Sequence, residues 1–152
     1  MVPGGVNEVF LLDTSKPDDI ILFLKSRKGF IKLALKHGTP VVPCFTFGLS
    51  GSYKFFMPPA IYRSKYMVKV TKMLGFLPVI YFGRFGIPYG IPLPNVTNVV
   101  IDKPIFVEKV EGEVSQEILD RYHALYIKRL VDLFERHKSK NPGYEKKKLV
   151  IL

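Results

Sequence analysis

The sequence has no tryptophan and a single cysteine, Cys44. One cysteine cannot close an internal disulfide bond, which excludes the disulfide-rich secreted class and fits a reducing compartment or a buried thiol. No apolar run reaches the roughly 18 residues that a membrane-spanning helix needs. The best candidate, residues 73–83, contains a proline and two glycines. Residues 1–15 lack the basic start and apolar run of a signal peptide. Taken alone, these absences favour a soluble or membrane-peripheral protein.

Acidic residues are also scarce, with 13 Asp and Glu against 23 Lys and Arg, for a net charge of +10. Such an excess attracts polyanions: nucleic acid, anionic lipid headgroups or phosphorylated small molecules. The aromatic residues gather in apolar, proline-rich segments and do not alternate with the basic ones, as a base-stacking platform would require. We therefore expect no nucleic-acid partner. With 152 residues and 47% hydrophobic residues, the chain has the length and composition of one globular domain.

The three histidines give no catalytic or metal-binding pattern. His37, His123 and His137 lack the spacing of metal ligands, and no Gly-x-Ser-x-Gly nucleophile motif occurs in the sequence. We interpret each histidine as a structural or surface residue. The sequence thus assigns no catalytic residue, no metal site and no cofactor.

The first third of the chain predicts a strand, a helix and a second strand. Residues 20–26 and 39–48 are short apolar runs with β-branched and aromatic side chains, as in buried strands. Between them, Phe30, Leu33, Ala34 and His37 follow the spacing of one helical face, and Gly38 is a natural helix stop. This order favours a βαβ unit with a right-handed crossover.

The middle of the chain predicts irregular structure, whereas the end predicts regular strands and a helix. Residues 48–95 hold six glycines and six prolines, which predicts a long, irregular, apolar segment with a short helix near 64–74 and a strand near 79–83. Residues 97–110 predict β structure broken at Lys103-Pro104. Ser115 is a good N-cap for a helix of about 24 residues. Residues 141–152 are predicted to form a basic tail after a domain that covers residues 1–140.

Two features could bind anions, and each has an ordinary alternative. Gly4 and Gly5 follow a proline and can present consecutive N–H groups to an anion, or simply form a tight turn. Glu8 either braces that turn or is solvated. The basic residues Lys25, Arg27, Lys28, Lys32 and Lys36 are either a solvated helix face or a surface for phosphates or lipid headgroups.

Four quoted segments together resemble one family: VPGGVNE, RKGFIKLALKHGTPVVPCFTFG, DKPIFVEK and RYHALYIKRLVDLFERHK. They look like the C-terminal half of the diacylglycerol acyltransferase type 2 family, which includes monoacylglycerol and wax-alcohol acyltransferases. The central segment carries the match at the family's spacing through Arg27, Gly29, Phe30, Lys32, Ala34, Gly38, Val42, Pro43, Phe47 and Gly48.

The resemblance implies an α/β fold like that of part of the glycerolipid acyltransferases: a mixed sheet flanked by helices, with a long C-terminal helix. It implies an acyl-CoA-dependent O-acyltransferase of neutral lipid synthesis, converting diacylglycerol to triacylglycerol. Acyl-CoA, acylglycerol and a membrane surface are the expected partners, and a homo-oligomer remains open. The expected location is the endoplasmic reticulum membrane and the lipid droplet. The implied substrate-binding residues are Gly4, Gly5, Glu8, Arg27, Gly29, Phe30 and Lys32.

Three departures from the family pattern qualify these expectations. The family's active-site histidine lies in a His-Pro-His-Gly motif upstream of Pro-Gly-Gly, and the sequence contains no such motif. Leu49 stands where a glutamate or glutamine is usual, and Asp102 where a glycine is usual. From the missing motif we expect a fragment that begins inside the family's domain and is inactive by itself. Leu49 and Asp102 indicate a divergent member of the family and leave its acceptor open. The alternative is a non-catalytic, membrane-peripheral protein that binds lipid or acyl-CoA.

Overall fold

The computed structural model describes residues 19–56, 69, 73 and 80–152. These belong to two compact units, unit 1 (Met1–Phe47 with Asn98–Leu152) and unit 2 (Gly48–Thr97). The Pro-Gly-Gly turn lies outside the described residues. So does most of the helix predicted near 64–74, of which only Lys69 and Met73 are described, both helical.

In unit 1 the predicted first helix is confirmed as α2, Gly29–His37, although its buried face differs from the prediction. Gly38 ends the helix in the left-handed conformation (φ 64°), as expected for a glycine stop. The buried residues are Ile31, Ala34 and Leu35, whereas the predicted Leu33 is 51% exposed. Apolar residues surround most of this short helix, so their spacing alone leaves the buried face ambiguous, and packing against the second helix selects it.

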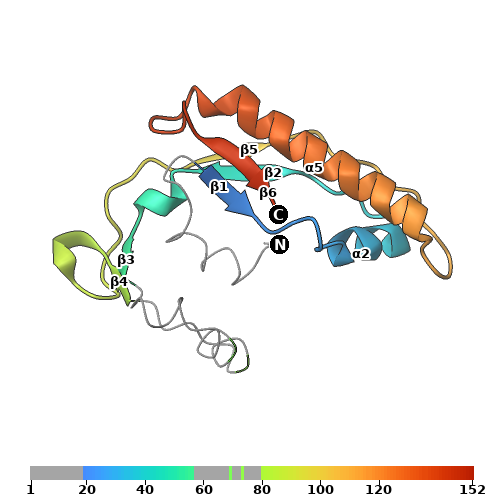
Figure 1. Ribbon diagram of the computed structural model, residues 1–152, viewed down its shortest axis with the longest axis horizontal. Helices are drawn as coiled ribbons and strands as arrows, with labels where there is room; N and C mark the ends of the chain where they lie inside the picture. Colours follow the sequence, from blue (N-terminus) through green and yellow to red (C-terminus); the bar gives the residue numbers. More distant parts are fainter. Residues whose placement is uncertain (1–18, 57–68, 70–72, 74–79) are drawn as a thin grey trace. The chain divides into compact units, whose positions relative to one another are not determined.

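That second helix is α5, Gln116–Lys138, which confirms the predicted long C-terminal helix. Ser115 caps it, since its side chain accepts a hydrogen bond from the Ile118 N–H. At the other end, the Asn141 side chain donates to the His137 carbonyl at 2.8 Å. The Lys140 N–H donates to the same carbonyl at 3.1 Å, so two donors close the end of the helix. Figure 1 shows α5 running along the strands of unit 1, with α2 near its N-terminal end.

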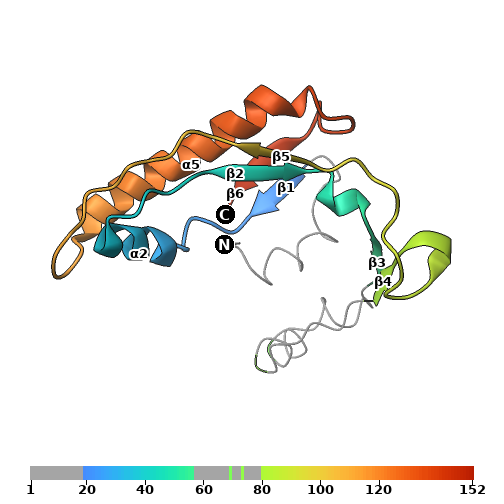
Figure 2. The same cartoon turned by 180° about the vertical axis from the view of Figure 1, so that it is seen from behind.

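The strands of unit 1 form two two-stranded sheets. β1 (Asp19–Leu22) pairs in parallel with β6 (Lys148–Ile151). β2 (Cys44–Phe47) pairs in antiparallel orientation with β5 (Asn98–Ile101). Among the described residues β1 and β2 do not pair with each other, so the predicted βαβ unit and single mixed sheet are wrong in this respect. The chain is nevertheless α/β, with both parallel and antiparallel strand pairs (Figure 2).

The segment predicted to be a basic tail supplies one strand of this fold. β6 lies within residues 141–152 and pairs with β1, residue for residue from Asp19↔Lys148 to Leu22↔Ile151. Tyr144 and Asn141 are also buried, at 8% and 5% exposure. The lysines made the segment look solvated, but Leu149, Val150 and Ile151, which follow them, are half-buried.

The core of unit 1 lies between α5 and the strands. One cluster stacks the Phe47 and Phe134 rings at 5.6 Å between centroids, with Phe45 and Tyr144 packed edge-on around them. The other joins Leu35 of α2 to Tyr126 and Leu130 of α5. Both clusters include residues of α5, so this helix is the common surface on which unit 1 assembles.

The opposite face of the β2–β5 pair is exposed. Side chains alternate along residues 41–47, so that Pro43 and Phe47 are buried while Val42 and Cys44 face outward. Cys44 is therefore an exposed thiol, so of the two alternatives that the single cysteine left open, the buried thiol does not hold. Val99 and Ile101 of β5, the partners of Thr46 and Cys44, are 60% and 66% exposed.

Unit 2 contains an antiparallel pair of strands, β3 (Lys54–Phe56) and β4 (Ile80–Phe82). β4 confirms the strand predicted near 79–83. Two short 3₁₀ turns are described as well, η1 (Leu49–Gly51) and η2 (Arg84–Gly86). No helix within the described residues is both long and apolar enough to cross a membrane.

Phe134 is fully buried and stacks on Phe47, so its removal tests the role of α5 as the organising surface. We expect Phe134→Ala to lower the free energy of unfolding by about 3–5 kcal/mol, measured by urea denaturation. The control, Leu125→Ala, shortens a 39% exposed side chain on the same helix. We expect it to cost about 1 kcal/mol or less. Equal losses in the two variants would contradict this account of the core.

Candidate functional site

Four of the seven predicted substrate-binding residues lie in the described structure, at the start of α2. Arg27 precedes the helix, Gly29 and Phe30 begin it, and Lys32 lies in its first turn. Gly4, Gly5 and Glu8 lie outside the described residues, so the structure does not bring them to this surface or away from it.

The segment that carries Lys25 and Arg27 is held in place by its backbone. The N–H groups of Leu24 and Lys25 donate to the Leu152 carbonyl at 2.9 and 2.8 Å. The Arg27 N–H donates to the Leu24 carbonyl at 3.0 Å. Leu24 itself is buried at 2% exposure, which anchors the turn to the core. The two basic side chains are thereby left on the outside of a fixed turn.

Lys25, Arg27 and Lys32 form what we call the α2 basic surface. All three are exposed, and none makes an ion pair with any other described residue. The neighbouring Lys28 is different, because its ammonium lies 2.6 Å from the Asp120 carboxylate. The hydrogen bond from Lys28 holds the pKa of Asp120 below its usual value.

The helix itself adds to the positive field of this surface. α2 has no acidic residue in its first turn, and no side chain caps its first N–H groups. These groups carry the positive end of the helix dipole, which favours an anion nearby. A Cβ at Gly29 would meet nothing within 4 Å, so the space beside this residue is open. This arrangement can hold a phosphate or carboxylate group.

Phe30 has a different role from its neighbours in the predicted site. Its ring packs edge-on against Tyr126 at 4.9 Å and against His123 at 6.3 Å between centroids. It is half-buried against the core cluster. The structure therefore makes Phe30 an anchor that fixes the start of α2 on α5, and leaves the exposed basic side chains as the groups that a ligand can reach.

His123 lies beneath this surface and is a structural residue, as its sequence context predicts. It is buried at 5% exposure, and its Nε2 lies 2.9 Å from the Leu24 carbonyl. That carbonyl can only accept, so Nε2 carries the proton and donates. Burial lowers the pKa of His123 below its ordinary value of 6.5, which favours the neutral ring. His137 likewise bonds to a helix carbonyl, with Nδ1 2.8 Å from the oxygen of Leu133.

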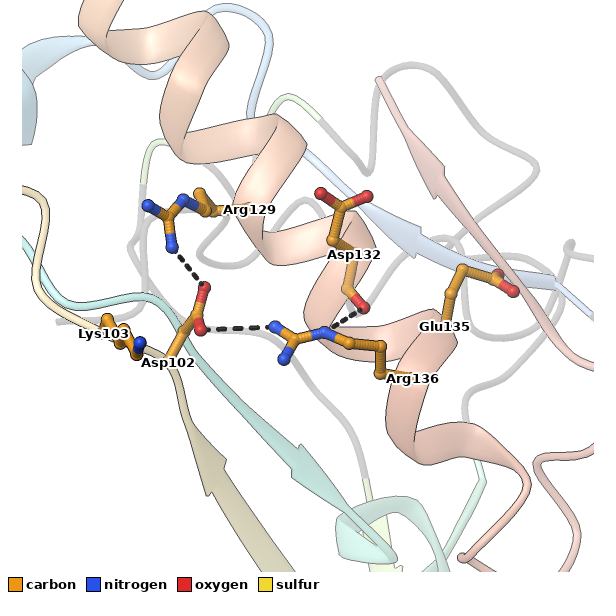
Figure 3. Close-up of a pocket in the computed structure, with 6 residues that line it drawn as sticks. All are labelled: Asp102, Lys103, Arg129, Asp132, Glu135 and Arg136. Atoms are coloured by element: carbon orange, nitrogen blue, oxygen red, sulfur yellow. Dashed lines mark hydrogen bonds and ion pairs between the residues drawn. The ribbon is translucent and has the colours of Figure 1, made fainter.

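A second charged cluster was not predicted from the sequence. The carboxylate of Asp102, directly after β5, is 8% exposed and lies 3.5 Å from Arg129 and 3.2 Å from Arg136. Figure 3 shows both guanidinium groups extending from α5 toward this carboxylate. Burial raises the pKa of Asp102, but the Lys103 N–H and the two arginines outweigh burial and hold the pKa below 3.8. The seven-residue spacing of the arginines on one helix face was the available signal.

Around this cluster lies an open hollow of about 520 Å³, lined by Asp102, Lys103, Arg129, Asp132, Glu135 and Arg136. Its six lining residues are all charged, and the three basic and three acidic groups compensate one another. We interpret it as an ion-pair network that joins β5 to α5. Nor do the described residues contain a group of three or more His, Cys, Asp or Glu placed to hold a metal ion.

Comparison with known proteins gives one consistent result. A sequence profile of the diacylglycerol acyltransferase family matches residues 1–152. Diacylglycerol O-acyltransferase 2 of Bos taurus is 36% identical over 149 residues, which cover 92% of this chain and 39% of the bovine one. Acyl-CoA wax alcohol acyltransferase 2 of Mus musculus is 34% identical over 160 residues, covering 100% and 46%. The chain spans less than half the length of these relatives. No solved structure matches it.

The ion pairs of Asp102 should stabilise unit 1. We expect Asp102→Asn to lower the free energy of unfolding by about 1–2 kcal/mol near neutral pH, because both arginines are partly solvated. A carboxyl whose folded pKa is depressed stabilises above its ordinary pKa of 3.8 and loses that contribution as pH falls. The difference in free energy of unfolding between Asp102→Asn and the parent, measured by urea denaturation, should therefore shrink below that pH. Asp132→Asn, which breaks no ion pair among the described residues, should leave stability unchanged.

His123 should make stability depend on pH in a higher range than Asp102 does, around the ordinary histidine pKa of 6.5. Its folded pKa is lowered, so the unfolded chain binds more protons once the pH falls below 6.5, and stability decreases there. Urea midpoints measured between about pH 7.5 and 5.5 should fall in the parent chain and fall less in His123→Gln, whose amide can still donate to Leu24. The control His37→Gln, which replaces an exposed histidine, should show the same change of urea midpoint with pH as the parent. An equal change in the parent and both variants would contradict the role assigned to His123.

Proposed function

The chain belongs to the diacylglycerol acyltransferase family, and on that basis we propose that it takes part in acyl transfer from acyl-CoA to the hydroxyl group of an acylglycerol. The acceptor implied by most of the relatives' names is diacylglycerol, which would give triacylglycerol. The observation that carries this proposal is the α2 basic surface within the matched region, because coenzyme A is a polyanion with several phosphate groups.

On this proposal each exposed group of the surface has a defined task. Lys25, Arg27 and Lys32 contact the phosphates of acyl-CoA, and the uncapped N–H groups at the start of α2 lie beside them. Phe30 and His123 hold the helix start in position from below. Gly4, Gly5 and Glu8 are proposed to contact the acylglycerol, on the strength of the sequence motif alone.

The chemical step needs a general base that removes the proton from the acceptor hydroxyl, so that the oxygen can attack the thioester carbonyl and release the CoA thiol. The family motif that supplies this base, His-Pro-His-Gly, does not occur in the 152 residues. The buried His123 is occupied by the Leu24 carbonyl and is not a substitute. We therefore propose that this chain corresponds to the C-terminal half of the domain, and that by itself it binds acyl-CoA without turning it over.

The substrates suggest where the protein works. Diacylglycerol and triacylglycerol reside in membranes and lipid droplets, so we propose a membrane surface as a further partner and the endoplasmic reticulum membrane and lipid droplet as the location. A second candidate function follows from the missing base: a non-catalytic protein that binds acyl-CoA or lipid at the membrane. The two candidates differ in whether a polypeptide that contains this sequence and His-Pro-His-Gly transfers the acyl group.

The phosphate contacts can be tested by binding acyl-CoA to the chain in a titration calorimeter. We expect Arg27→Gln combined with Lys32→Gln to weaken binding roughly tenfold, because each exposed charge pair contributes a small factor. Raising the ionic strength should weaken the parent more than the variant.

The matched control is Lys140→Gln combined with Lys146→Gln, which removes the same charge from exposed positions in the C-terminal segment. It should bind acyl-CoA like the parent. Equal weakening in both variants would show that only net charge matters, and would remove the α2 basic surface from the proposal. A thiol assay with acyl-CoA and diacylglycerol should detect no CoA release by the chain alone, and release there would overturn the account of the missing base.

A further inference from the structure

The turn after β4 in unit 2, residues 83–91, exposes large apolar side chains. Phe85 is 79% exposed, Ile87 54%, Tyr89 67% and Ile91 70%. Single exposed apolar residues are ordinary on a protein surface, whereas several within nine consecutive residues mark an interaction site. We call this segment the β4 turn.

The backbone of the β4 turn is closed on itself. The Arg84 N–H donates to the Ile91 carbonyl at 2.7 Å, and the Gly83 N–H donates to the Ile87 carbonyl at 3.2 Å. The Tyr89 N–H donates back to Tyr81 of β4 at 2.8 Å. A Cβ at Gly83 would collide with the Ile91 carbonyl, so the neck of the turn is tight. The turn thus satisfies much of its own backbone while its apolar side chains point outward, a combination that suits an apolar medium, where unpaired N–H and C=O groups are costly.

The turn is also held in an unusual conformation. Phe85 and Tyr89 have positive φ values of 65° and 55°, which bulky residues rarely adopt. Contacts of the rings of Tyr53 and Tyr89 with Tyr81 support it, at 6.1 and 6.3 Å between centroids. Such strain persists where function requires it. Here it keeps an aromatic side chain exposed at each of two places in the turn.

The charge of the segment around the β4 turn indicates the kind of partner that the turn binds. Residues 48–97 contain six basic residues, and all 13 acidic residues of the chain lie outside this segment. Within the turn, the Arg84 guanidinium lies 5.0 Å from the centre of the Phe85 ring. An apolar turn that contains Arg84, in a segment without a single carboxylate, matches the two layers of an anionic bilayer surface: acyl chains below and phosphate groups above.

We propose that the β4 turn inserts its apolar side chains into the surface of an anionic phospholipid bilayer, with Arg84 at the level of the headgroups. The inference rests on the membrane partner proposed above and assigns it to particular residues. It uses unit 2 alone, which contributes none of the residues of the α2 basic surface.

The chain has no tryptophan, so a single introduced indole reports its own surroundings. We would compare Phe85→Trp with Phe106→Trp, which replaces a 76% exposed phenylalanine of unit 1. Each full chain is mixed with vesicles of phosphatidylcholine mixed with phosphatidylserine, and then with vesicles of brominated lipids. We expect the Phe85→Trp emission to shift to shorter wavelength and to be quenched by bromine, and the Phe106→Trp emission to do neither.

Loss-of-binding variants complete the test by vesicle sedimentation. Phe85→Asn suits the left-handed backbone, since asparagine tolerates positive φ, and Ile91→Thr keeps a β-branched side chain. Together they should weaken vesicle binding roughly a hundredfold, because two large apolar side chains lose their insertion. Phe106→Asn should bind vesicles like the parent. Far-ultraviolet circular dichroism and the unfolding temperature establish that each variant is folded.

Three results would overturn the inference. They are equal quenching of the two indoles, vesicle binding that survives the double variant, and binding to a protein or to a second copy of the chain that the same variant abolishes while vesicle binding persists. Failure here is distinguishable from failure of the acyl-CoA proposal, because acyl-CoA titration of the Phe85→Asn and Ile91→Thr chain reports on unit 1 independently. Normal acyl-CoA binding with no vesicle insertion would reject only the membrane role of the turn.

Discussion

The burial of one face of α5 is the interaction on which the rest of unit 1 depends. Its aromatic and aliphatic side chains contact β2, β5 and α2, and the cluster around Phe134 also includes Tyr144, just before β6. Two-stranded sheets are marginal by themselves, because each has too few partners to bury a face. Packing on a common helix supplies the missing contacts. The position of the α2 basic surface follows from this packing, since Phe30 and Lys28 both contact α5.

Two kinds of ion pair tie the surface of unit 1 to that helix. Lys28 and Asp120 join the start of α2 to the first turns of α5, and Asp102 joins the end of β5 to two arginines farther along. The first pair is largely solvated and screened by salt, whereas the Asp102 carboxylate is nearly buried and leaves water only because two cations face it. The difference explains why Asp102 is tolerated at a position where the family resemblance leads one to expect glycine.

The basic side chains that form no ion pair with a described residue are the ones we propose to bind anions. Lys28, Arg129 and Arg136 are matched by carboxylates, but Lys25, Arg27 and Lys32 are not matched by any described residue. In unit 2 there is no carboxylate to match any cation. A cation without an ion-pair partner costs little free energy while it is solvated, and its attraction to an anion that binds beside it is not reduced by a neighbouring carboxylate. The α2 basic surface and the β4 turn are thus two places where charge is uncompensated among the described residues, and we propose a soluble polyanion for the first and a layer of headgroups for the second.

The sequence by itself determined the two helices of unit 1 and the family, whereas the substrate-binding residues that it indicated stay a prediction. Ser115 and Gly38 act through bonds and dihedral angles of their immediate neighbours, so their roles were predictable. The tertiary structure alone decided strand pairing, the buried face of α2 and the partners of Asp102. These depend on residues far apart in the chain: β6 takes the edge of β1, and Arg129 and Arg136 reach a carboxylate 27 and 34 residues away. Local periodicity carries no information about such contacts, because it repeats equally well against any apolar partner.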